Sequence, residues 1–228
     1  MEYDRERYSG KLSAFGIGIL FMIVALIVQE IIESMPTIYL LYIRHISLTD
    51  LSTVLFHFEK TYIIEYSIFI GMIGGFCQEF AKYVAVDTRK ASRTIYIGLG
   101  FSAVDLAVLF LPVLLVRPAF TDFSILLLSF NVILSLLFHP STAMLLKWGR
   151  VMKHQVPVFL LALFSHSLID GGLVFTDIRV IENVTQDHTY SLIYWAMALA
   201  VTAIILIIAL RLFPKTDERQ VAEKPVVY

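Results

Sequence analysis

Six separate windows of mostly apolar residues, each about 20 residues long, restrict the possible folds of this chain more than any other feature. A helix of that length crosses roughly 30 Å of hydrocarbon, and within lipid only helices and closed barrels satisfy their own backbone hydrogen bonds. Hydrophobic residues make up 58% of the 228 positions, more than one soluble core needs. The sequence therefore predicts an all-α, multi-pass membrane protein, a single domain over 1–228 folded as a six-helix transmembrane bundle. The predicted spans are 12–34, 63–86, 95–116, 124–146, 156–175 and 190–213.

The distribution of basic residues predicts the orientation of these spans. Thirteen Lys and Arg residues lie in the two tails and in the second and fourth connections, whereas four lie in the other three connections. Because basic residues gather on the cytoplasmic side of a membrane, we expect a cell-membrane protein with both termini in the cytoplasm. The triplet Asn-Val-Thr at 183–185 then lies outside. A net charge of -1 gives no electrostatic footprint for nucleic acid, and the lone Cys77 rules out an intrachain disulfide.

Four ionisable residues interrupt the apolar spans at one depth. Glu79, Asp105, His139 and His166 each lie about seven to ten residues from the predicted cytoplasmic end of their span, which places them roughly 10 to 15 Å below that surface. A charged group inside the bilayer costs about 2.5 to 3.5 kcal/mol on insertion scales. We therefore expect these side chains to face one another or a wet cavity rather than lipid.

Helical spacing groups further polar residues with these four. In the second span, Gln78 and Lys82 share one stripe with two glycines, and Glu79 lies at its edge. In the fifth span, the segment HSLID places His166 and Asp170 one turn apart on one face. Small residues let helix backbones approach closely within membranes. The pattern predicts a polar seam among spans two to five. The third and fourth spans have similar stripes at Gly98, Phe101, Ser102 and Asp105, and at Asn131, Ser135, His139 and Thr142.

Each of these residues also has a structural interpretation. Gln78 is of a type that joins membrane helices by hydrogen bonds, Lys82 is near enough to the interface to extend its amine toward it, and Asp105 could pair with Lys82. The shared depth favours a common site instead. A buried carboxylate with two imidazoles suits hydrolysis of a peptide bond, which needs a base to activate water and donors to stabilise the oxyanion.

Zinc is the competing hypothesis, because two His and one carboxylate form a familiar ligand set. The sequence has no HExxH-type pair, and each imidazole comes from a different span. We therefore expect a site without metal or other cofactor.

Four segments in consistent order over about 70–175 resemble the motifs of a known protease group. The segment GGFCQEFAKY is similar to a Glu-Glu-x-x-Arg/Lys motif, GLGFSAVD to a Gly-x-Gly-(His or Phe)-x-x-x-Glu motif, LLFHPSTAMLLKWG to a His followed by small residues and Gly, and LLALFSHSLIDGG to a His-Ala-Leu-x-Asp/Asn motif. These motifs are typical of glutamate-type intramembrane proteases in the CAAX-endopeptidase and bacteriocin-processing clan, particularly the YhfC and PrsW branches.

The resemblance implies an endopeptidase that cuts a membrane-associated protein or peptide near the cytoplasmic leaflet. Glu79 matches the second position of the acidic doublet and would serve as the base, alone or through a water shared with Gln78. The chain departs from the pattern where Gln78 occupies the first acidic position and Asp105 replaces Glu. The remaining implied site residues are the basic Lys82, the imidazoles His139 and His166 as oxyanion or proton-transfer groups, and Asp170, which would orient His166.

Two other functions use the same polar seam. The Gln78 substitution favours a catalytically inactive relative that binds membrane proteins. A small proton-coupled transporter would need polar residues continuing to the outer face, and the outer halves of the second and third spans lack them.

Overall fold

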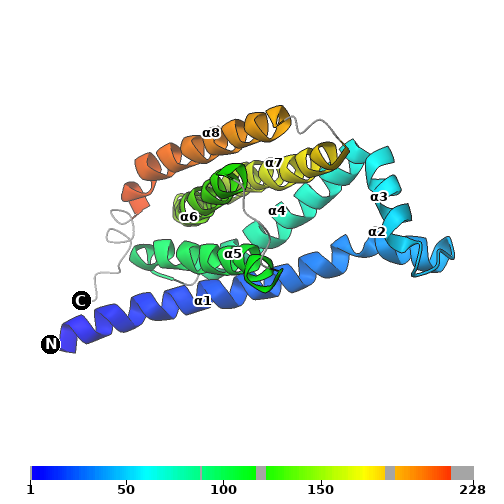
Figure 1. Cartoon of the computed structure of the whole chain (residues 1–228). Helices are drawn as coiled ribbons and strands as arrows, with labels where there is room; N and C mark the ends of the chain where they lie inside the picture. The colour runs from blue at the N-terminus through cyan, green and yellow to red at the C-terminus, as the bar shows by residue number, and fades with distance from the viewer. Residues whose placement is uncertain (1, 88, 117–121, 183–187, 217–228) are drawn as a thin grey trace.

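The structure is a computed structural model that describes residues 2–87, 89–116, 122–182 and 188–216 (Figure 1). The triplet at 183–185, Arg117 and the two last basic residues, Arg219 and Lys224, lie outside the described residues. All regular elements of the described residues are helical. They are α1 (Glu2–Glu33), α2 (Met35–Ile38), the π-helix η1 (Tyr39–Ile43), α3 (Leu51–Thr61), α4 (Ile63–Asp87), the 3₁₀-helix η2 (Ala91–Arg93), α5 (Thr94–Val116), α6 (Asp122–Val151), α7 (Gln155–Glu182) and α8 (Thr189–Leu212).

The all-α prediction is confirmed for the described residues, and the predicted multi-pass character is supported by five helical stretches long and apolar enough to cross a membrane. The predicted second span coincides with α4, which is not one of these five. Gln78, Glu79 and Lys82 make its second half polar. The five stretches are Gly10–Ile43, Ala91–Leu111, Ile125–Val151, Gln155–Val180 and Thr189–Thr216.

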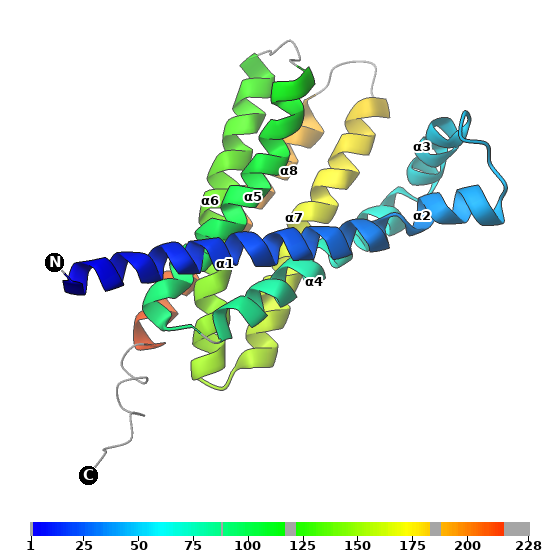
Figure 2. The same cartoon turned by 90° about the horizontal axis from the view of Figure 1, so that it is seen from below.

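The first predicted connection, 35–62, contains structure that the sequence analysis did not anticipate. It forms α2, η1 and α3, which lie beyond the end of the bundle, next to the end of α1 and the start of α4 (Figures 1 and 2). α3 has no buried residue. At 11 residues, α3 is too short to appear among apolar windows of membrane-spanning length.

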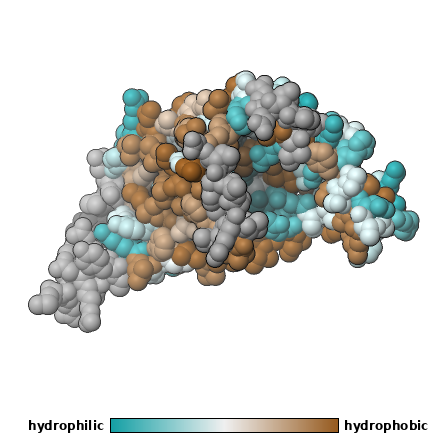
Figure 3. Space-filling view, in the orientation of Figure 1, coloured by the Kyte–Doolittle hydropathy of each residue, from teal (hydrophilic) through white to brown (hydrophobic). Residues whose placement is uncertain are grey.

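The bundle brings α4 against α7 and α1, and α5 against α1 and α6. In Figure 2, α5 to α8 run in broadly similar directions, and α1 and α4 cross them on one side. The largest fully buried side chains of the core include the apolar Phe101, Phe138 and Leu145 together with the charged Lys82 and Glu79. Many large apolar residues instead face outward, so much of the visible surface is apolar (Figure 3), as expected for a surface in contact with lipid.

Glycines set the closest helix contacts, and these contacts position the polar residues. A Cβ on Gly71 would lie 2.3 Å from the carbonyl oxygen of Ser167, and a Cβ on Gly75 would lie 2.4 Å from the hydroxyl of the same serine. The backbones of α4 and α7 therefore touch where Ser167 faces the two glycines. Likewise, a Cβ on Gly98 of α5 would lie 2.4 Å from the Cα of Pro140 in α6. Distances under 3.0 Å leave no space for a side chain there, so these glycines permit the packing.

Candidate active site within the helix bundle

Glu79 is the centre of the polar cluster. Its side chain is completely buried, and Oε1 contacts groups from three helices. Lys82 Nζ of α4 donates to it at 2.6 Å, and His166 Nδ1 of α7 lies 2.7 Å away. Thr142 of α6 donates to the same oxygen at 3.4 Å. Gly75 lies one turn before Glu79, and Ser167 directly follows His166. The contact between Gly75 and Ser167 therefore brings this carboxylate and this imidazole together.

Lys82 is held in the interior by one charge and several weaker partners. Besides the bond to Glu79, its ammonium donates to Thr142 Oγ1 at 2.8 Å. The same nitrogen lies 5.2 Å from the ring centroid of Phe101 and 5.9 Å from that of Phe138. An ammonium within about 6 Å of a ring face is attracted to it, more strongly where water is excluded. The side chain of Lys82 is completely buried against Glu79. The lysine therefore does not extend to the membrane interface.

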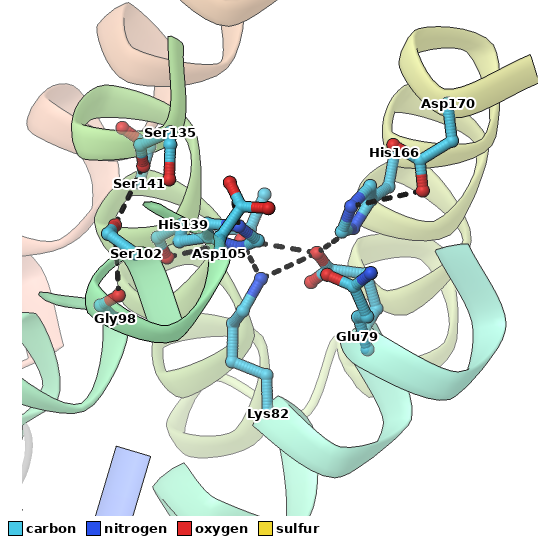
Figure 4. Close-up of polar contacts among 12 residues, drawn as sticks. Glu79, Lys82, Gly98, Ser102, Asp105, Ser135, His139, Ser141, His166 and Asp170 are labelled. Atoms are coloured by element: carbon cyan, nitrogen blue, oxygen red, sulfur yellow. Dashed lines mark hydrogen bonds and ion pairs between the residues drawn. The ribbon is translucent and has the colours of Figure 1, made fainter. Parts of the chain in front are cut away.

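Two Asp–His pairs flank this centre. His166 Nε2 lies 3.5 Å from Asp170 Oδ2, so the two nitrogens of this imidazole face two different carboxylates. On the facing helices, His139 Nε2 lies 3.6 Å from Asp105 Oδ2. The two imidazoles are near-perpendicular neighbours, with ring centroids 5.5 Å apart. Figure 4 shows both pairs converging on the space above Lys82 and Glu79.

The site combines a dry interior with an open side. Glu79 has no exposed surface, whereas 43% of the Asp105 side chain and 27% of the Asp170 side chain are exposed. Two inner atoms, Glu79 Oε2 and His139 Nδ1, are buried without a hydrogen-bond partner among the described residues. A buried polar atom of this kind is costly unless water or a ligand satisfies it.

Gln78 points away from this centre. Its amide nitrogen donates to Gln29 Oε1 of α1 at 3.0 Å, and Gln29 in turn donates to Glu33 at 2.9 Å. Adjacent helix positions differ by about 100° in direction, which places Gln78 toward α1 when Glu79 faces α7. The expectation of a water held between Gln78 and Glu79 is therefore not supported by the direction of the Gln78 amide. A Cβ on Gly74 would contact both Gln29 and Asp170, so the two polar groups are neighbours.

The structure thus brings together most of the residues selected from the sequence. Glu79, Lys82, His166 and Asp170 form one connected set, and the pair His139 and Asp105 joins it through the two imidazole rings. Asp105 contacts His139 rather than Lys82, the partner considered from the sequence.

Two residues of the network have no role predicted from the sequence. The sequence indicates only a polar stripe for Thr142, but it touches both Glu79 and Lys82. Gln29 is not among the predicted site residues, although it is the partner of Gln78. The signal that could have identified Gln29 as part of the network is its polar side chain within an apolar span.

No protein-family model, curated protein or solved structure matches this chain. The resemblance to the YhfC and PrsW branches therefore remains a prediction. Among the described residues, no group of three or more His, Cys, Asp or Glu side chains is arranged to hold a metal ion.

Proposed function

We propose that the protein is a membrane-embedded endopeptidase that hydrolyses a membrane-associated protein or peptide. The observation that carries the proposal is the complete burial of the Glu79 carboxylate in contact with a lysine, a threonine and a histidine from three helices. Burying charged groups costs several kcal/mol per ion unless their partners compensate. Polar groups that are this costly inside a membrane are usually functional.

The membrane arrangement that goes with this proposal has six spans. α4 packs against both α1 and α7, and we count it as a sixth span beside the five apolar stretches. The basic residues favour both termini in the cytoplasm of a cell. The site then lies in the cytoplasmic half of the bilayer, where a substrate segment would be cut near the cytoplasmic leaflet.

The contacts suggest a division of roles. Lys82, Thr142 and His166 occupy Glu79 Oε1, which leaves Oε2 as the oxygen that accepts a proton from an attacking water. The water oxygen bonds to the scissile carbonyl carbon. The resulting oxyanion would be stabilised by His139 Nδ1, which has no other partner among the described residues and donates when the ring is an imidazolium with Asp105 as its counterion. The proton then passes to the leaving amine as the peptide bond breaks.

The two aspartates position the imidazoles in this scheme. Asp105 faces Nε2 of His139, and Asp170 faces Nε2 of His166. A carboxylate beside one ring nitrogen fixes the orientation of an imidazole and holds a proton on that nitrogen. Because both aspartates are partly exposed, they also provide the polar route by which water reaches the buried carboxylate.

The test compares new protein N-termini in membranes that contain the wild-type chain, the variant His166→Gln or the variant His57→Gln. His57 is exposed on α3, away from the cluster, so it is the matched control. Mass spectrometry of chemically labelled N-termini should find cleavage sites in membrane-associated segments with the wild type and His57→Gln, and at least tenfold fewer with His166→Gln. Thermal unfolding of each purified variant checks that it is folded. Identical N-termini in all three samples would contradict the proposal.

One observation favours a second function, a catalytically inactive relative that binds membrane proteins. The position of the first acid in the motif is Gln78, and its amide is already bonded to Gln29. In that case His166→Gln would leave both the N-termini and the set of co-purified membrane proteins unchanged. An endopeptidase would instead retain more uncleaved substrate when His166 is replaced.

A further inference from the structure

A second site lies at the opposite end of α4 from the Glu79 cluster, where α2, η1 and α3 meet the bundle. These segments line an open cavity of about 540 Å³. Aromatic side chains dominate its lining, contributed by η1, α3, the residue after α3 and α4. The aromatic residues are Tyr39, Phe58, Tyr62, Tyr66 and Phe69.

The rings of this aromatic cavity meet at large angles. Phe58 and Tyr62 have centroids 5.0 Å apart with planes inclined by 48°, and Phe58 and Tyr66 are perpendicular at 6.5 Å. These rings therefore do not stack face to face. The face of an aromatic ring carries negative electrostatic potential and attracts a cation, including a quaternary ammonium group.

Acidic residues reinforce that preference. Glu65 is the one charged residue among the described residues that line the cavity, and it is exposed to solvent. Two further carboxylates, Glu59 and Glu33, lie close enough to act electrostatically on Tyr66. A cavity with aromatic walls and a carboxylate at its edge is complementary to an organic cation and repels an anion.

The residues around the cavity indicate which kind of molecule would carry such a cation. Large apolar side chains adjoin the cavity and are exposed, with Ile38 44%, Ile64 61% and Tyr42 72% accessible. The apolar stretch Gly10–Ile43 also ends here. Aromatic residues at the end of an apolar span mark the level of lipid headgroups. We propose that the aromatic cavity binds the ammonium headgroup of a zwitterionic phospholipid, with Glu65 and the aromatic rings contacting the ammonium.

This site is independent of the proposed hydrolysis, and its test does not use cleavage. The full chain, purified in a maltoside detergent, is titrated with dihexanoyl phosphatidylcholine or dihexanoyl phosphatidylglycerol, and bound lipid is counted by native mass spectrometry. Phosphatidylcholine should bind at least threefold more tightly than phosphatidylglycerol, which has no ammonium. Glu65→Gln and Tyr62→Leu should each weaken phosphatidylcholine binding by about threefold to thirtyfold, the range expected for a cation held against rings.

The control is Tyr42→Leu, which removes an exposed tyrosine that does not line the cavity. It should bind phosphatidylcholine like the wild type. Glu65→Gln preserves the shape of a side chain on the helix surface, so this variant still tests phosphatidylcholine binding if Tyr62→Leu fails to fold. Equal binding of the two lipids, or unchanged affinity in Glu65→Gln, would overturn the proposal. Binding of tetralysine at Glu65 without binding of phosphatidylcholine would also overturn it, because the occupant would then be a peptide.

Discussion

The pair of Lys82 and Glu79 makes a strong prediction about stability. Both side chains are completely buried, and Nζ lies 2.6 Å from Oε1. With an effective dielectric constant of about 20, Coulomb's law gives an attraction of about 6 kcal/mol at that distance. Removing one member leaves the other charge buried without compensation, which typically costs about 3 to 5 kcal/mol. We expect Lys82→Met and Glu79→Gln each to lower the free energy of unfolding by that amount.

The double variant separates the effect of losing the whole ion pair from the effect of leaving one buried charge unpaired. Lys82→Met combined with Glu79→Gln removes both charges and the cost of burying them, so its stability should return to within about 2 kcal/mol of the wild type. The coupling energy of the double-mutant cycle should then exceed about 3 kcal/mol. The double variant should nevertheless be inactive in the N-terminus assay, because it lacks the carboxylate proposed as the base.

The assay is equilibrium unfolding in mixed micelles with increasing dodecyl sulfate, followed by the fluorescence of Trp148 and the buried Trp195. Lys90→Met is the matched control, because Lys90 is exposed and should change stability by less than about 0.5 kcal/mol. A Lys82→Met variant as stable as the wild type would refute the reasoning. It would mean that the lysine is neutral or reaches water, and that the carboxylate is not held by a buried ammonium.

Three further predictions concern packing, topology and metal dependence. Gly71→Ala should lower the free energy of unfolding by about 1 to 3 kcal/mol, because its Cβ would lie 2.3 Å from the Ser167 carbonyl oxygen, whereas Gly16→Ala, with no atom within 4 Å, should not destabilise. Equal effects at the two glycines would contradict the α4–α7 contact. In intact cells, an impermeant thiol reagent should label Leu48→Cys from outside but label His154→Cys only after permeabilisation, and the reverse result would overturn the proposed orientation. Cleavage, once detected, should persist in 1,10-phenanthroline, and loss of cleavage that zinc restores would favour the zinc hypothesis.

Helix positions were predictable from the sequence because the apolar windows depend only on local composition. The window at 95–116 corresponds to α5 at Thr94–Val116, and the window at 190–213 corresponds to α8 at Thr189–Leu212. The same local logic could not find α3, because its 11 residues are too few to form an apolar window of membrane-spanning length.

Part of the candidate site was also predictable. Lipid makes an ionisable side chain costly wherever it occurs, so Glu79, His139 and His166 stood out before any contact was known. The expectation of a similar depth followed from counting residues along spans predicted to run alternately up and down. Depth along a span is therefore a property that the sequence determines by itself.

Rotation of each helix and the choice of partners were decided only by the tertiary structure. The sequence placed Gln78 and Glu79 side by side, but packing turns Gln78 toward Gln29 of α1 and Glu79 toward His166 of α7. Packing also pairs Lys82 with Glu79, and Asp105 with His139. These pairings depend on which helices touch and how closely, and that is set by contacts between residues far apart in the chain. No periodicity within one span carries that information, because each span is compatible with several neighbours until the whole bundle is packed.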